Sequence, residues 1–359
     1  MAKKLPVGIL GATGMVGQRF VTLLANHPWF EVAVVAASPR SAGKSYKEAV
    51  SDRWLLSESI PASIAKLRVL SVEKDMDAIA KEVSFVFSAL DMEKEEIRSI
   101  EESFAGKGIP VVSNNSAHRW TEDIPIVMPE INQDHLSLIS VQQKNRGWKK
   151  GFIVVKPNCS IQSYVPLITP LLEFQPKEII VTTLQAVSGA GKTLQTWLEM
   201  IDNVIPYIKG EEEKSEKEPM KVWGNIQDGK IIHATQPHIT ATCIRVPVND
   251  GHMASVGVSF AKKPSREQIL NAWRNFNPLK ELNLPSAPVP FITVFDEENR
   301  PQTHLDRNLG NGMGISAGRL REDSIVDYTF IGLSHNTIRG AAGGAVLTAE
   351  LLKEKGYIT

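Results

Sequence analysis

The sequence predicts an α/β protein in which a doubly wound parallel sheet comes first and an α+β domain follows. Up to residue 155, short apolar runs alternate with stretches of helical spacing, the pattern of parallel strands joined by crossover helices. Beyond it, β-rich runs dominate, and 359 residues are enough for two cores. We expect residues 1–155 to form the first domain, completed by 338–359, and residues 156–337 to form the second.

Composition limits the kinds of partner. The chain has 40 Lys plus Arg and 40 Asp plus Glu, so a net charge of zero gives no reason to expect nucleic acid or an anionic membrane. No apolar run reaches the roughly 20 residues of a membrane span. Two cysteines cannot build a disulfide framework, and no Cys/His cluster has metal-ligand spacing. With no leader pattern at the N-terminus, we expect a cytoplasmic protein without a metal.

A glycine turn follows the first expected strand, residues 6–10, and leads into a helix that ends near Asn26. In a dinucleotide-binding unit of the Rossmann type, such glycines let the backbone approach a pyrophosphate at the helix N-terminus. The alternative is an ordinary tight turn, but the place between strand and helix favours the cofactor. The residues expected at the cofactor are Gly11, Thr13, Gly14, Met15, Val16 and Gly17.

The loop after the second strand, residues 31–37, indicates which cofactor is used. NAD enzymes usually carry an acid there for the ribose hydroxyls, whereas this loop has two cations and two hydroxyls, which suit a 2′-phosphate. NADP is therefore the better prediction, and a solvated basic loop is the alternative. The loop residues are Ser38, Arg40, Ser41 and Lys44.

The β-α repetition continues to about residue 150. Ser88 and residues 113–116 follow expected strands, so they either contact a ligand or cap the next helices. Arg119 lies just beyond, and a polar joint at 144–150 precedes the second domain. Strands are expected at 67–70, 83–88 and 109–112, and a helix at 94–104.

Cys159 follows an apolar strand and a Pro-Asn break. A helix over residues 160–172 would place the thiol at its positive end and favour a thiolate near neutral pH. The alternative is a buried structural cysteine, which is the common fate of an isolated Cys.

Strands are also expected at 178–184, 241–248 and 253–260, and the small-residue loop 185–192 follows the first of them. His252 beside a glycine turn should be partly exposed and able to act as a base. A tight hairpin at 249–251 would put Arg245 and His252 on opposite faces, so a shared site requires the segment to bend. Cys243 is expected in the core.

The most charged stretch, residues 210–221, is expected to be mainly a solvated face. Within it, Glu218 and Lys221 form a surface pair or a zwitterion-binding pair, and the spacing does not separate the two. A strand over 325–333 precedes Asn336, and a small-residue helix from Gly340 to about Lys353 should return to the first domain.

The motifs taken together resemble aspartate-semialdehyde dehydrogenase, in its archaeal and fungal branch, along nearly the whole chain. The motifs, in the order found in that family, are GATGMVGQ (11–18), PNCS (157–160), QAVSGAGK (185–192), E-x-x-K (218–221), R-x6-H (245–252) and NTIRGAAGG (336–344).

The resemblance implies that NADPH reduces L-aspartyl 4-phosphate to L-aspartate 4-semialdehyde, on the route to lysine, threonine and methionine, in a homodimer or homotetramer. It makes Cys159 the nucleophile, His252 the acid-base partner and Gln185 the residue that orients the acyl group. Pro219 departs from the family and is expected in the first turn of a helix. The resemblance further implies that Arg245 binds the α-carboxylate, Glu218 the amino group, Arg119 and Lys221 the phosphate, that Asn158 contacts substrate, and that Ser88, Ser188, Gly189 and Asn336 contact the cofactor.

The chemistry agrees with these roles. A thiolate that attacks an acyl phosphate expels phosphate and leaves a thioester able to accept hydride. The alternatives are a malonyl-CoA or succinyl-CoA reductase, an N-acetylglutamyl-phosphate reductase, and a non-catalytic NADP-sensing protein. Intact Arg245, Glu218 and Lys221 favour an amino-acid substrate, and a sensor has no reason to pair Cys159 with His252.

Overall fold

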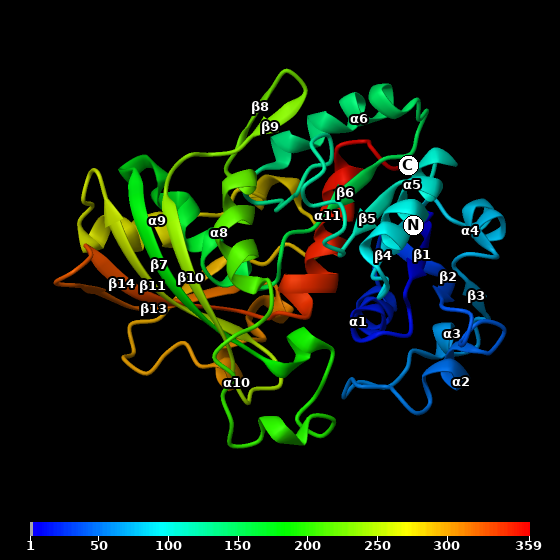
Figure 1. Ribbon diagram of the computed structural model, residues 1–359, viewed down its shortest axis with the longest axis horizontal. Helices are drawn as coiled ribbons and strands as arrows, with labels where there is room; N and C mark the ends of the chain where they lie inside the picture. The colour runs from blue at the N-terminus through cyan, green and yellow to red at the C-terminus, as the bar shows by residue number, and fades with distance from the viewer. Residues whose placement is uncertain (1–2) are drawn as a thin grey trace.

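The computed structural model describes residues 3–359, which form two sheets with separate cores (Figure 1). The first sheet is wholly parallel, in the order β3-β2-β1-β4-β5-β6. The strand order reverses at β1, and α/β sheets bind ligands at such a switch point. The predicted doubly wound sheet is confirmed. Its strands are β1 (Leu5–Leu10), β2 (Phe30–Ala37), β3 (Val69–Ser71), β4 (Phe85–Ser88), β5 (Val111–Ser113) and β6 (Ile153–Val155).

Helices cover both faces of this sheet because its strands are apolar on both sides. In β1, Val7 and Ile9 join one core while Leu10 joins the other. The C-terminal helix packs into the first of these cores, as predicted, and lies beside the first sheet in Figure 1. Helices α1 (Met15–Leu24), α6 (Leu138–Arg146) and α11 (Gly343–Glu354) belong to that core, and α4 (Met76–Glu82) and α5 (Lys94–Gly106) to the other; α2 (Tyr46–Val50) and α3 (Ala62–Ala65) are short.

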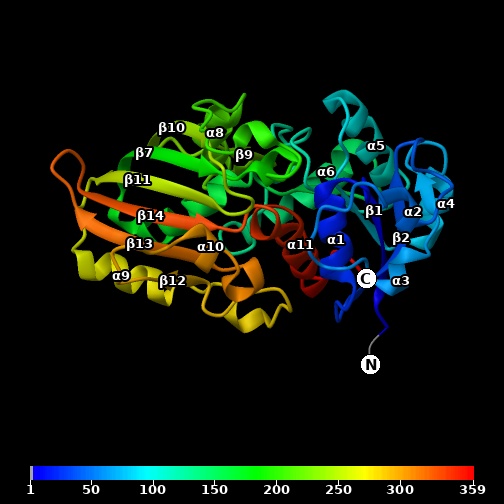
Figure 2. The ribbon, with the colours of Figure 1, turned by 90° about the horizontal axis from the view of Figure 1, so that it is seen from below.

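The second sheet is mixed, in the order β10-β7-β11-β14-β13-β12 (Figure 2). Strands β10 and β11 do not form the hairpin considered above, because β7 lies between them, parallel to β10 and antiparallel to β11. The segment 246–251 therefore crosses the end of β7. The strands are β7 (Pro176–Gln185), β10 (His238–Arg245), β11 (His252–Phe260), β12 (Ile292–Val294), β13 (Ile315–Glu322) and β14 (Tyr328–Ser334).

The predicted single helix over 160–172 is wrong. The chain forms three short segments there, because Pro166 and Pro170 lack the N–H groups that a continuous helix needs. These segments are η2 (Ser160–Ser163), α7 (Val165–Ile168) and η3 (Thr169–Phe174). Further elements of this half include α8 (Glu211–Val222), α9 (Arg266–Asn275), α10 (Thr303–Asp306), the hairpin β8 (Asn225–Gln227) and β9 (Lys230–Ile232), and the π-helical turn η8 (Ile338–Ala342).

One face of the second sheet packs on α7 and α9, through residues such as Val181, Val256 and Trp273. The other face has no covering element in the described chain. On it, Ile180 is 55% exposed and Ser255 is also exposed. Within residues 3–359 no helix combines the length and apolar character needed to cross a bilayer.

Candidate active site

The two candidate reactive groups, 93 residues apart in the chain, meet where the two sheets adjoin. Cys159 follows β6 and caps η2, whereas His252 is the first residue of β11. The Sγ of Cys159 lies 3.5 Å from Nε2 of His252. The other ring nitrogen, Nδ1, accepts the backbone N–H of Ala186 at 3.1 Å. A neutral ring held in this way carries its proton on Nε2 and donates it toward the sulfur.

The strand order explains why Arg245 and His252 share one site. The C-terminal ends of β7 and β10 lie beside the start of β11, so Gln185, Arg245 and His252 converge. Nη1 of Arg245 donates to the carbonyl of Ala186 at 2.6 Å. A Cβ added to Gly189 would lie 2.8 Å from that Nη1 and 3.2 Å from the imidazole, so a larger residue here would displace the Arg245 guanidinium.

Two expectations about protonation are corrected. His252 is fully buried rather than partly exposed, and burial, with Arg245 next, holds its pKa well below the ordinary range. Burial also raises the pKa of the half-buried Cys159 thiol. Glu211 raises this pKa further, whereas Lys156, Arg119 and Arg245 oppose the rise. The short 3₁₀ turn after Cys159 supplies no long helix dipole, so the resting pair is a thiol beside a neutral imidazole.

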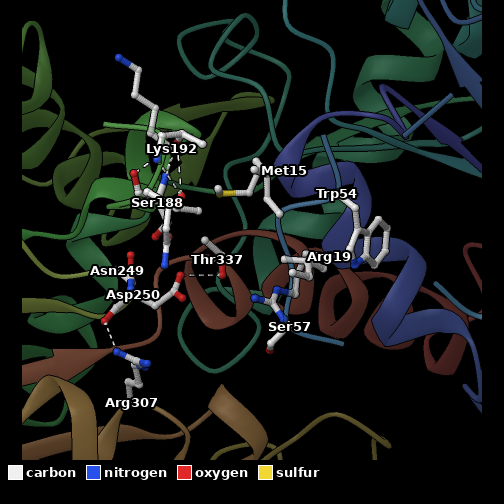
Figure 3. Close-up of a pocket in the computed structure, with 15 residues that line it drawn as sticks. Met15, Arg19, Trp54, Ser57, Ser188, Lys192, Asn249, Asp250, Arg307 and Thr337 are labelled. Atoms are coloured by element: carbon white, nitrogen blue, oxygen red, sulfur yellow. Dashed lines mark hydrogen bonds between the residues drawn. The ribbon is translucent and has the colours of Figure 1, made fainter. Parts of the chain in front are cut away.

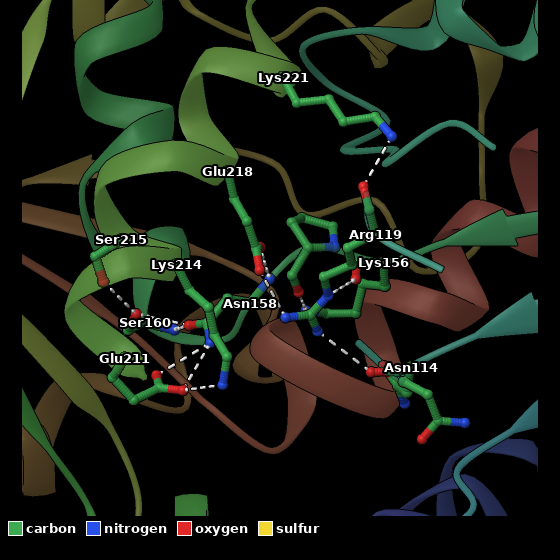
Figure 4. Close-up of polar contacts among 12 residues, drawn as sticks. Asn114, Arg119, Lys156, Asn158, Ser160, Glu211, Lys214, Ser215, Glu218 and Lys221 are labelled. Atoms are coloured by element: carbon green, nitrogen blue, oxygen red, sulfur yellow. Dashed lines mark hydrogen bonds and ion pairs between the residues drawn. The ribbon is translucent and has the colours of Figure 1, made fainter. Parts of the chain in front are cut away.

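Glu218 is fully buried and its carboxylate is already satisfied by the protein. One oxygen accepts Nη1 of Arg119 at 2.8 Å and the other accepts the N–H of Asn158 at 2.6 Å (Figure 4). The predicted contact with a substrate amino group is therefore corrected: Glu218 holds Arg119 and the backbone next to Cys159. Arg119 keeps further N–H groups that can meet a phosphate.

Lys221 is also a structural residue, contrary to the prediction that it binds phosphate. Its ammonium donates to the carbonyls of Arg119, Thr121 and Ile124 at 2.8 to 2.9 Å, which uses all three donors. Burial lowers its pKa to about 8. Its role is to fix the segment that carries Arg119.

A second E-x-x-K pair, one that sequence reasoning missed, lies at the start of the same helix. Glu211 accepts Nδ2 of Asn158 on both carboxylate oxygens, at 3.1 and 3.0 Å, and Nε2 of Gln185 at 3.4 Å. Lys214 binds Glu211 at 2.7 Å, and the Lys214 side chain remains 30% exposed. Although burial raises the pKa of Glu211, Lys214 brings it below its usual range. The repeated spacing, seven residues earlier, was the signal in the sequence.

Pro219 lies inside α8 rather than in its first turn. A proline there leaves the carbonyl four residues back, that of Ser215, without its helical donor. The hydroxyl of Tyr164 donates to this carbonyl at 2.5 Å and replaces the missing bond. The hydrogen bond that Pro219 removes from α8 is thus replaced within the fold.

A cleft of about 550 Å³ separates the start of α1 from the loops of the second sheet (Figure 3). Gly11 has φ +82°, and a Cβ on it would lie 2.2 Å from the carbonyl of Ala89. A Cβ on Gly17 would lie 2.2 Å from the carbonyl of Gly11. The first N–H groups of α1 have no carbonyl four residues back in the helix. This turn therefore fits a pyrophosphate. The residues that line the cleft include Met15, Arg19, Trp54, Ser188, Lys192, Asn249, Asp250 and Thr337.

The other residues expected at the cofactor differ in whether their side chains are exposed or already hydrogen-bonded within the protein. Ser38, Arg40 and Lys44 are exposed at the end of β2, whereas the hydroxyl of Ser41 is buried and accepts Nη2 of Arg53 at 3.0 Å. The hydroxyl of Ser88 is buried and accepts Nδ2 of Asn115, so its side chain belongs to a structural network. Asn336 donates to the hydroxyl of Ser188 and accepts the N–H of Gly251, and so fixes this wall of the cleft.

A nucleotide-binding sheet with a cysteine–histidine pair beside it defines a two-domain dehydrogenase. Residues 6–139 match the family model "Semialdehyde dehydrogenase, NAD binding domain", and residues 168–339 match "Semialdehyde dehydrogenase, dimerisation domain". The chain is 46% identical over 351 residues to the aspartate-semialdehyde dehydrogenase of Archaeoglobus fulgidus, covering 97% of this chain and 98% of that one. This chain belongs to the aspartate-semialdehyde dehydrogenase family.

Further comparisons agree. The aspartate-semialdehyde dehydrogenase of Saccharomyces cerevisiae is 40% identical over 372 residues and covers 100% of both chains. The crystal structure of the Candida albicans enzyme with NADP superposes with a TM-score of 0.88 at 38% identity, covering 99% of this chain and 100% of that one. The predicted family, enzyme activity and NADP cofactor are confirmed.

Proposed function

We propose that Cys159 is the nucleophile through which this enzyme reduces L-aspartyl 4-phosphate to L-aspartate 4-semialdehyde. The observation that carries the proposal is the distance of 3.5 Å between Sγ of Cys159 and Nε2 of His252, at a half-buried sulfur. A reactive cysteine requires access and positive surroundings, and Arg119, Arg245 and Lys156 supply the latter.

Once the thiol proton of Cys159 has left to solvent, the sulfur attacks the acyl carbon, and the carbonyl electrons move onto its oxygen to give an oxyanion. When they return, the bond to phosphate breaks and a thioester on Cys159 remains. The sulfur is then no longer anionic, so the Nε2–H of His252 is free to donate to the acyl oxygen. Because Nδ1 is occupied by Ala186, His252 donates a proton rather than accepts one. NADPH, when bound, would supply the hydride that reduces the thioester. The C–S bond then breaks, which releases the aldehyde and returns the electron pair to the sulfur of Cys159.

Substrate is held by charges of opposite sign. Arg245 binds the α-carboxylate, since a guanidinium holds a carboxylate through two parallel bonds. Glu211, rather than Glu218, faces the amino group, and Lys214, rather than Lys221, joins Arg119 at the phosphate. Gln185, between Glu211 and the loop carrying Ala186, orients the acyl group.

NADP lies with its pyrophosphate at the first turn of α1, from Gly11 to Gly17. Its 2′-phosphate meets Ser38, Arg40 and Lys44, which are exposed at the end of β2. Across the cleft, Ser188 and Gly189 form the wall that faces the cofactor, with Asn336 behind them.

The chain divides into a cofactor domain, residues 1–155 with 338–359, and a catalytic domain, residues 156–337. Two copies associate through the uncovered face of the second sheet, which carries exposed Ile180. The description of the matched model as a dimerisation domain supports this assignment. Both cysteines are unpaired, as in proteins of the reducing cytoplasm, where fractionation should find the enzyme.

The Cys159→Ala variant tests the nucleophile. We expect reduction of NADP with aspartate semialdehyde and phosphate to be lost, while NADPH still quenches protein fluorescence on binding. A CoA-thioester reductase would turn over with CoA in place of phosphate. Substantial phosphate-dependent turnover by Cys159→Ala would contradict the assignment.

A further inference from the structure

Lys156 is a buried lysine directly before the Pro-Asn-Cys turn. Its backbone is fixed, because its N–H donates to Ser113 and its carbonyl accepts Nε of Arg119 at 3.2 Å. Its side chain is only 3% exposed, and Nζ donates to the carbonyl of Pro157 at 2.6 Å. An ammonium has three donors, and this is the one protein acceptor that Nζ has within residues 3–359.

No carboxylate of the described chain neutralises this charge. Glu218, the carboxylate whose charge raises the pKa of Lys156, is bound by Arg119 and by the N–H of Asn158. A buried ammonium without an ion-pair partner destabilises a fold, so the fold itself gains nothing from a lysine here. Its presence therefore points to a negative charge that forms during the reaction.

The segment that runs from η8 into α11 packs against both Cys159 and the stem of Lys156. A Cβ on Gly340 would lie 2.8 Å from Cβ of Cys159, and a Cβ on Gly344 would lie 3.0 Å from Cε of Lys156. Two glycines four residues apart in one segment thus leave room for the nucleophile and for the lysine. Burial lowers the pKa of Lys156 to about 7, and Cys159 acts on it in the opposite direction. The ammonium form of Lys156 and the thiolate form of Cys159 therefore stabilise each other.

We propose that Lys156 is a positioning residue for the Cys159 thiolate: its ammonium stabilises the charge left on Sγ when the thiol proton leaves to solvent. The inference rests on the proposed function of Cys159. In the tautomer that accepts the Ala186 N–H on Nδ1, His252 holds its proton on Nε2, and in that tautomer the cations around Sγ stabilise the anion. The other charged groups around this pair are Arg119, Arg245, Arg339, Glu211 and Glu218.

The test is the pH dependence of Cys159 alkylation by iodoacetamide in the substrate-free enzyme, followed by peptide mass spectrometry. Cys243, which is fully buried, serves as the internal control. For Lys156→Met we expect the alkylation midpoint to rise by about one pH unit, which makes labelling about tenfold slower below the midpoint. Lys156→Arg should retain the wild-type midpoint. Lys156→Met should bind NADPH as the wild type does.

An unchanged midpoint in folded Lys156→Met would overturn the proposal, as would a Lys156→Arg variant that behaves like Lys156→Met. If Lys156→Met does not fold, Lys156→Gln, which also removes the ammonium, should show the same rise in the alkylation midpoint. The labelled peptide reports on the sulfur whether or not the enzyme turns over. Turnover that survives complete labelling of Cys159 would therefore refute the nucleophile without affecting the test of Lys156.

Discussion

At Cys159, burial of the thiol and the cations around it act in opposite directions. Burial raises the pKa of the thiol, whereas Lys156, Arg119 and Arg245 lower it. The thiol of Cys159 is therefore protonated in the resting enzyme, and the cations around it reduce the free energy needed to ionise it. A resting thiol is also less easily oxidised than a permanent thiolate.

We expect one of the two E-x-x-K pairs of α8 to bind substrate and the other to stabilise the fold. Glu211→Gln removes a carboxylate that faces the substrate site, so we expect the KM for aspartate semialdehyde to rise about thirtyfold, corresponding to about 2 kcal/mol. Glu218→Gln, its matched control, leaves the buried guanidinium of Arg119 without its ion-pair partner. It should cost about 3 kcal/mol of unfolding free energy, measured in urea. A Glu218→Gln variant of normal stability with the larger rise in KM would reverse the assignment.

Single residues could be predicted where a motif has one match in the chain. Cys159, His252 and the opening glycines each belong to such a motif. The E-x-x-K motif occurs twice in α8, and only the fold shows that Glu218 and Lys221 are fully bound within the protein while Lys214 keeps a side chain that is 30% exposed. The protonation state of His252 also required the structure, since its burial follows from contacts far away in the chain.

At the scale of one element, α8 tolerates Pro219 because Tyr164 replaces a lost hydrogen bond. Tyr164→Phe removes the hydroxyl that donates to the Ser215 carbonyl, and we expect a loss of about 1–3 kcal/mol in the free energy of unfolding. In a Pro219→Ala background the backbone N–H returns, so the same change should cost clearly less. Equal costs in the two backgrounds, measured by urea unfolding, would refute the compensation.

The parallel strands of the first sheet were predictable because they are short apolar runs bounded by turns. The break of residues 160–174 into three segments was not predicted. An apolar run of this length is typical of one buried helix, and this pattern was given more weight than Pro166 and Pro170. The bend that unites Arg245 and His252 depends on β7 entering between β10 and β11. Strand order of this kind is set by the whole sheet and not by the connecting loop.

For the whole molecule, the uncovered face of the second sheet predicts self-association. Ile180→Glu places a charge on that face, and we expect sedimentation velocity to show a monomer where the wild type is at least a dimer. Ile232→Glu is the matched control, because Ile232 on β9 is similarly exposed, 52% against 55%. A wild type that sediments as a monomer, or a control that dissociates equally, would place the interface elsewhere.

The two sheets together bring the nucleophile, its cations and the cofactor cleft to one place. The most direct measurement is to mix the enzyme with aspartate semialdehyde and NADP in the absence of phosphate, quench with acid, and digest for mass spectrometry. We predict an aspartyl thioester on the peptide that contains Cys159, discharged when phosphate is added before the quench. An enzyme that turns over with phosphate yet yields no adduct, or carries it on another residue, would contradict the account.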